Sequence, residues 1–181
     1  RSKELTDVQE KLLKKSESIL QDIPNEWDLE FEDFFKSIKT AALFESWTNE
    51  ITEDKLLTDY NVAPGELHNR LETADWLIYT LGEIALLLGY KDILSEIRKT
   101  RIRLRYGIKE ELIPLVKLKD VGRVRARRLF STGLTSLEKL KEIPLDSLKR
   151  IVGLAVAESI KEQLEGKEKM KDEQATLKEL G

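Results

Sequence analysis

The chain has 181 residues, of which 40% are apolar and 36% charged, and its formal net charge is −3. This length suits one or two domains, and the apolar fraction is sufficient to bury a core. Cysteine is absent, which excludes disulfides and thiolate metal sites and fits a reducing, cytoplasmic setting. No run of 18 apolar residues occurs, so the sequence predicts no membrane span.

The first predicted element in chain order is a helix over residues 5–20, where apolar side chains recur at helical spacing. The segment DIPNEWDLEF breaks the pattern at Pro24. A second helix is predicted over residues 32–51 and a short third helix over residues 52–61. The start of the chain has neither a methionine nor an apolar leader, so we expect it to lie within a longer polypeptide.

A long helix is predicted over residues 65–88. Pro64 suits the first turn of a helix, Glu66 suits its positive end, and Gly89 provides a stop. Its 24 positions would span roughly 36 Å. On a helical wheel the predicted core face consists of Leu67, Leu71, Ala74, Ile78, Leu81, Ala85 and Leu88.

Trp76 falls on the opposite side of this helix, about 170° from the centre of the predicted core face. Asn69, Thr73 and Thr80 lie on the same side. Two interpretations are open: a second packed face on a central helix, or an aromatic platform on which a nucleic-acid base stacks. Such stacking contributes roughly 1–3 kcal/mol and tolerates any base. The helix alone favours packing, whereas the polar neighbours argue against deep burial.

The charges are segregated along the chain. Residues 1–75 hold 9 Lys and Arg against 18 Asp and Glu, a net charge of −9. Residues 98–128 hold 12 Lys and Arg against 3 Asp and Glu, a net charge of +9. A basic block on an otherwise acidic chain is typical of polyanion binding, although charge runs are usually solvated helix faces. Here the block overlaps a hairpin motif, which favours binding.

That motif is the segment LIPLVKLKDVGRVRARRLFSTGLTSLEKL, whose pattern is similar to a helix-hairpin-helix. A turn at Asp120, where the pattern has glycine, and Gly122 would expose backbone N–H groups at a helix start, which attracts phosphate. The neighbouring basic residues are Lys119, Arg123, Arg125, Arg127 and Arg128. Phosphate contacts position a strand without reading its sequence. A weaker second copy, LDSLKRIVGLAVAESI, is expected to pack with the first.

Three blocks together resemble archaeal superfamily-two DNA helicases that act at stalled replication forks, relatives of the helicase half of DNA polymerase theta. The blocks are VAPGELHNRLETADWLIYTL, IRKTRIRLRYGIKEELIPLV and LKDVGRVRARRLFSTGLTSLEKL. The resemblance implies that the first block is a ratchet helix lining the DNA channel, in which Trp76 contacts the strand. Asn69 stands where the family has an arginine, and Arg70 is one position away. The third block, by the same resemblance, holds the exiting strand and brakes the motor.

The expected fold is all-α, a helical bundle with a long central helix followed by a small helix-hairpin-helix domain. The predicted limits are 1–106 for the bundle, 107–165 for the hairpin domain and 166–181 for a charged tail. The expected function is that of a monomeric accessory region of an ATP-dependent DNA helicase in DNA repair, located with chromosomal DNA. It would bind single-stranded or forked DNA. The motor and winged-helix domains would precede it in the same polypeptide.

The sequence contains no G-x-x-x-x-G-K-[ST] phosphate loop, so ATP and Mg²⁺ are expected only in the parent helicase. No catalytic or metal residue is predicted, and the single histidine, His68, is expected to be an exposed helix residue. The predicted DNA-binding residues are Trp76, Asn69, Arg70, Thr73, Thr80, Lys119, Gly122, Arg123, Arg125, Arg127 and Arg128. Two alternatives are a free-standing DNA-binding or repair module, distinguished by the upstream reading frame, and a helical protein scaffold, distinguished by single-strand titration.

Overall fold

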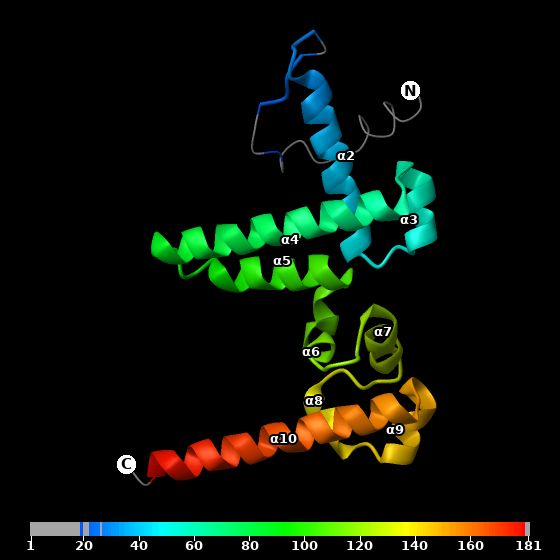
Figure 1. The fold of residues 1–181 in the computed structure, drawn as a ribbon, viewed down its shortest axis with the longest axis vertical. Helices are drawn as coiled ribbons and strands as arrows, with labels where there is room; N and C mark the ends of the chain where they lie inside the picture. Colours follow the sequence, from blue (N-terminus) through cyan, green and yellow to red (C-terminus); the bar gives the residue numbers. More distant parts are fainter. Residues whose placement is uncertain (1–18, 20–21, 26, 180–181) are drawn as a thin grey trace. The chain divides into compact units, whose positions relative to one another are not determined.

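The computed structural model describes residues 19, 22–25 and 27–179, with side chains up to residue 166 (Figure 1). These residues form helices and connecting loops with no strand among them, which confirms the predicted all-α class. The elements are α2 (Phe31–Thr48), α3 (Glu53–Tyr60), α4 (Pro64–Leu87), α5 (Leu94–Tyr106), η2 (Glu110–Leu112), α6 (Ile113–Val116), α7 (Arg123–Ser131), α8 (Leu137–Glu142), α9 (Leu145–Val152) and α10 (Leu154–Glu179). The helix predicted over residues 5–20 lies outside the described residues.

Contacts divide the chain into two units, residues 1–71 and 72–181, with the division inside α4. In the first unit α2 packs on α3, and Leu43, Leu56 and Leu67 are buried between them and the start of α4. The phenol of Tyr60 joins this core and donates a hydrogen bond to the carbonyl oxygen of Ala42 at 2.9 Å. The domain limits predicted after residues 106 and 165 stay predictions.

In the second unit α4 and α5 run side by side in opposite directions, as Figure 1 shows. Gly89 at φ +82° and Gly107 at φ +62° follow the ends of the two helices. Both adopt the left-handed conformation in which glycine is favoured, so the sequence marks each helix end locally. The long helix, predicted over residues 65–88, spans Pro64–Leu87.

The core face predicted for α4 is wrong in part. Leu67 and Ala85 are buried, but Leu81 is 51% exposed and Leu88 is 66% exposed. Helix α5 approaches α4 at Gly82, where an added Cβ would lie 3.5 Å from Ile97 Cγ2. Residue 81 points about 100° away from residue 82 on a helix, so the leucine is left at the edge of this contact.

The remaining helices of the second unit, from η2 to α10, enclose one core. It combines residues of the first hairpin, among them Val121 and Leu129, with residues of the second, among them Val152 and Ile160. The expectation that the two copies pack together is therefore confirmed. The segment predicted as a charged tail over residues 166–181 continues α10 as helix to Glu179.

Candidate nucleic-acid interface

Trp76 is the most exposed aromatic residue on α4, with 63% of its surface accessible to solvent. Thr73 is also exposed, and Thr80 is half-buried. Thr80 Oγ1 donates a hydrogen bond to the backbone oxygen of Trp76 at 3.0 Å, as a helical threonine often does. An indole in this state presents a large apolar face to solvent, which is the requirement for stacking on a base.

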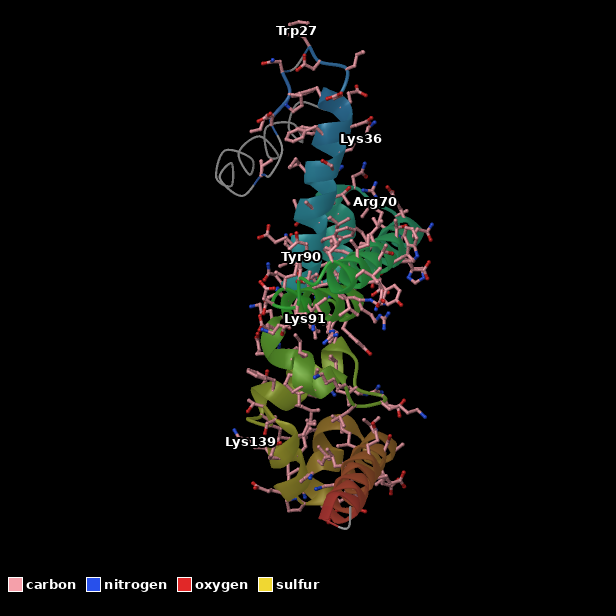
Figure 2. All side chains as sticks on the ribbon, turned by 90° about the vertical axis from the view of Figure 1, so that its left-hand side faces the viewer. Trp27, Lys36, Arg70, Tyr90, Lys91 and Lys139 are labelled. Carbon is pink, nitrogen blue, oxygen red and sulfur yellow. The ribbon has the colours of Figure 1, made fainter. Side chains whose placement is uncertain are left out.

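The structure gives different surroundings to Asn69 and Arg70, the two residues that could supply a polar partner beside Trp76. Asn69 is exposed, and by helical periodicity it points within about 20° of Trp76. Arg70, labelled in Figure 2, instead contacts α2. Its Nη1 donates to Thr40 Oγ1 at 2.7 Å, and it also forms an ion pair with Glu66. The hydrogen bond from Arg70 holds the pKa of the Glu66 carboxyl below its ordinary value. Arg70 is thus engaged within the first unit.

An ion-pair cluster that the sequence did not reveal lies one residue before Trp76. Arg101 donates from Nε to Asp75 Oδ1 at 2.9 Å and from Nη2 to Asp75 Oδ2 at 3.0 Å. Arg105 donates from Nη2 to Asp75 Oδ2 at 2.8 Å. The hydrogen bond with Arg101 is the main cause of a lowered Asp75 pKa. The only sequence signal was the four-residue spacing of the two arginines, which places them on one face of α5.

The hairpin turn before α7 is built around Asp120, whose φ is +66°. The motif has glycine at this position, and aspartate is among the few other residues that tolerate the left-handed conformation. Ser159 on α10 donates to Asp120 Oδ2 at 3.1 Å, and Arg125 Nη1 donates to the Asp120 carbonyl oxygen at 3.0 Å. Gly122 is the exposed N-cap of α7, and Lys119 is also exposed.

The arginines of α7 also contribute to the fold. Arg127 forms an ion pair with Glu111 at 2.9 Å, and its guanidinium carbon lies 5.1 Å from the centre of the Phe130 ring. Arg128 Nη1 donates to the carbonyl oxygen of Ile151 at 3.3 Å, which joins α7 to α9. Arg128 and Arg125 are exposed, whereas Arg123 and Arg127 are half-buried. This surface combines positive charge with side chains held in fixed positions.

Other kinds of site find little support in the described part of the chain. No three histidine or acidic side chains gather there as a metal site would require, and His68 is exposed on α4. None of the described helices is both long and apolar enough to cross a bilayer. What stands out is the pairing of an exposed aromatic residue on a long helix with a basic helix-hairpin-helix.

The all-helical fold places the chain in a class of protein, the helical domains of archaeal helicases. The chain belongs to the family described as archaeal helicase, domain 4, whose model matches residues 1–107. That membership confirms the resemblance to archaeal superfamily-two helicases.

Three similar proteins are each described as an ATP-dependent DNA helicase Hel308. The protein of Methanocella arvoryzae is 42% identical over 149 residues, 80% of this chain and 20% of its own length. That of Pyrococcus abyssi is 40% identical over 132 residues, 71% of this chain and 18% of its own length. That of Thermococcus kodakarensis is 39% identical over 163 residues, 88% of this chain and 14% of its own length. The chain spans a fifth or less of the length of these relatives.

Proposed function

We propose that this chain is the single-stranded or forked DNA-binding accessory region of an ATP-dependent DNA helicase. The observation that carries the proposal is the exposure of Trp76 on α4, in a chain whose relatives are named as such helicases. A tryptophan that is 63% exposed contributes little to a core, which leaves its indole available for another role. Stacking on the bases of a translocating strand supplies that role without sequence preference.

On this proposal the side of α4 that carries Trp76 guides the strand. The indole stacks on one base, while the polar groups of Asn69, Thr73 and Thr80 offer hydrogen bonds along the same side of the helix. Hydrogen-bonding groups of this kind position a strand, and the stacking adds affinity that does not depend on base identity. The strand slides because no contact depends on base identity.

The hairpin module is the second contact of the proposal. Lys119, Arg123 and Arg125 surround the start of α7, where the positive end of the helix favours phosphate. Holding the exiting strand here would slow the motor, so the module regulates translocation as well as binding. The motor itself, with ATP and Mg²⁺, belongs to other domains of the parent polypeptide, which acts as a monomer on chromosomal DNA.

Two measurements test the proposal. The 181-residue chain should bind a labelled single strand in a fluorescence anisotropy titration, and the affinity should fall as salt rises. In the intact helicase Trp76→Ala should slow the unwinding of a forked duplex while the variant remains folded. A chain that binds no single strand at low salt, or a Trp76→Ala helicase that unwinds normally, would contradict the proposal. The first outcome would favour a protein-interaction scaffold.

A further inference from the structure

We infer that Asp75, Arg101 and Arg105 are positioning residues that set the direction of the Trp76 indole by fixing the rotation of α4 against α5. The inference rests on the proposed function, because it assigns these residues a role that acts through Trp76. It concerns contacts within the second unit, where both helices lie.

The ion pair between Asp75 and Arg101 has a geometry that fixes orientation. Arg101 bonds both oxygens of Asp75, and Arg105 adds a third hydrogen bond to one of them. A guanidinium that binds a carboxylate through two parallel bonds fixes orientation as well as distance. The side chains of Asp75 and Arg101 are only 20% and 30% exposed, so water screens this pair less than a surface pair.

The contact with α5 extends along α4. Tyr79 lies one turn after Asp75, and the guanidinium carbon of Arg101 is 4.7 Å from its ring centre, a cation–π contact. Gly82 follows, close to Ile97 of α5. Residues 75, 79 and 82 share one side of a helix, so the three contacts together orient that side toward α5. Trp76 points about 100° away from Asp75 around the helix axis, so it lies outside the contact between α4 and α5.

Apolar packing by itself does not define this rotation. Leu77, Leu81 and Ile84 form an apolar row on α4 that is about half exposed, while in the second unit Ala85 is the only buried apolar residue of α4. A rotation of this part of α4 would bring the row toward α5. It would also move Asp75 away from Arg101 and leave a charge unpaired. The charged contact therefore selects one rotation among apolar alternatives, a role that polar contacts have in some proteins.

The direct test is fluorine NMR of the 181-residue chain labelled with 5-fluorotryptophan. The Trp76 resonance is identified by its loss in Trp76→Ala. Asp75→Asn should shift the Trp76 resonance and leave those of Trp27 and Trp47, both in the first unit, in place. The matched control is Glu96→Gln, which removes a carboxylate that pairs with Lys99 within α5 only, and it should shift none of the three. An unshifted Trp76 resonance in a folded Asp75→Asn chain would overturn the inference.

A double-mutant cycle in the intact helicase tests whether the effect passes through Trp76. Asp75→Asn should slow unwinding of a forked duplex by about fivefold, the factor that corresponds to the weaker end of base stacking. In a Trp76→Ala background the same change should alter the rate by less than about twofold, because additivity fails for residues that act together. An equal loss in both backgrounds would overturn the inference. Normal unwinding by Trp76→Ala would instead contradict the proposed function itself.

A conservative variant covers the case in which Asp75→Asn does not fold. Arg101→Lys keeps the positive charge but loses the two parallel bonds. Its Trp76 resonance should shift in the same direction as that of Asp75→Asn, by a smaller amount, at a melting temperature close to that of the unchanged chain. A folded Arg101→Lys chain with an unshifted Trp76 resonance would equally overturn the inference.

Discussion

Gln163 on α10 holds the backbone of Lys119 through both ends of its side-chain amide. Its Oε1 accepts the Lys119 N–H at 2.7 Å, and its Nε2 donates to the Lys119 carbonyl oxygen at 3.3 Å. The same Nε2 donates to the backbone oxygen of Ser159 at 3.0 Å. The second hairpin thus holds the turn of the first. The N–H of Lys119 is already bonded, so at this position the side chain is what remains to meet a phosphate.

Replacement of Gln163 by alanine should therefore loosen the hairpin turn. We expect a loss of about 1–2 kcal/mol in the free energy of unfolding, because each such hydrogen bond contributes about 0.5–1.5 kcal/mol. Urea unfolding followed by circular dichroism measures it. Glu162→Ala, an exposed neighbour on α10, is the control and should change stability by less than about 0.5 kcal/mol. Equal stability of the two variants would contradict the role given to Gln163.

The arginines of α7 differ in how directly their replacement tests DNA binding. Arg125 is exposed and bonds only a carbonyl oxygen in the turn, whereas Arg127 is paired with Glu111. Arg125→Ala should weaken single-strand binding alike for all sequences. It should also reduce the log–log salt slope by up to about 0.7. Lys36→Ala, in the first unit, makes the same charge change and should leave the slope as it was. An unchanged slope in Arg125→Ala would identify the cluster as a solvated face.

Trp76 and Leu67 on α4 should respond in opposite ways to truncation. Leu67 is buried, so Leu67→Ala should cost about 2–5 kcal/mol of stability. Trp76→Ala should cost far less, because the exposed indole leaves no cavity behind. Thermal melting of the 181-residue chain compares the two. A loss for Trp76→Ala as large as that for Leu67→Ala would mean that Trp76 is a packing residue.

The stability contributed by Asp75 should depend on pH. Bonding to Arg101 lowers the pKa of the Asp75 carboxyl in the folded state below its ordinary value of about 4. A lowered pKa stabilises the fold at pH values above the unfolded-state pKa, and this stability is lost as the pH falls through the folded-state pKa. The stability difference between the unchanged chain and Asp75→Asn should thus be constant above about pH 5 and should shrink as the pH falls below about 4. A stability difference that stays constant down to the lowest pH at which both chains fold would contradict this pH dependence.

The chain by itself should hydrolyse no ATP, with or without single-stranded DNA. The reason is that its sequence contains no phosphate loop of the form G-x-x-x-x-G-K-[ST]. A coupled assay of phosphate release measures this, with the intact helicase as the positive control. DNA-stimulated turnover by the purified chain, above that of a mock purification, would show that the chain contains a nucleotide site of another kind.

Local rules in the sequence determined the helical elements and the hairpin motif. Pro64 and Gly89 bracket the long helix because each residue restricts or permits particular backbone conformations whatever its surroundings. The buried positions Ala126 and Leu129 follow from the motif around Gly122. The exposure of Trp76 also agrees with its place opposite the predicted core face.

The contacts that orient these parts were decided by the tertiary structure. Asp75 and Arg101 are 26 residues apart in the sequence, and Lys119 and Gln163 are 44 apart, so no local pattern links them. The same holds for the covered side of α4. Because apolar residues surround much of this helix, periodicity defines more than one possible core face. In the second unit the position of α5 selects the side of α4 that is buried, since burial depends on what lies opposite as well as on the side chain itself.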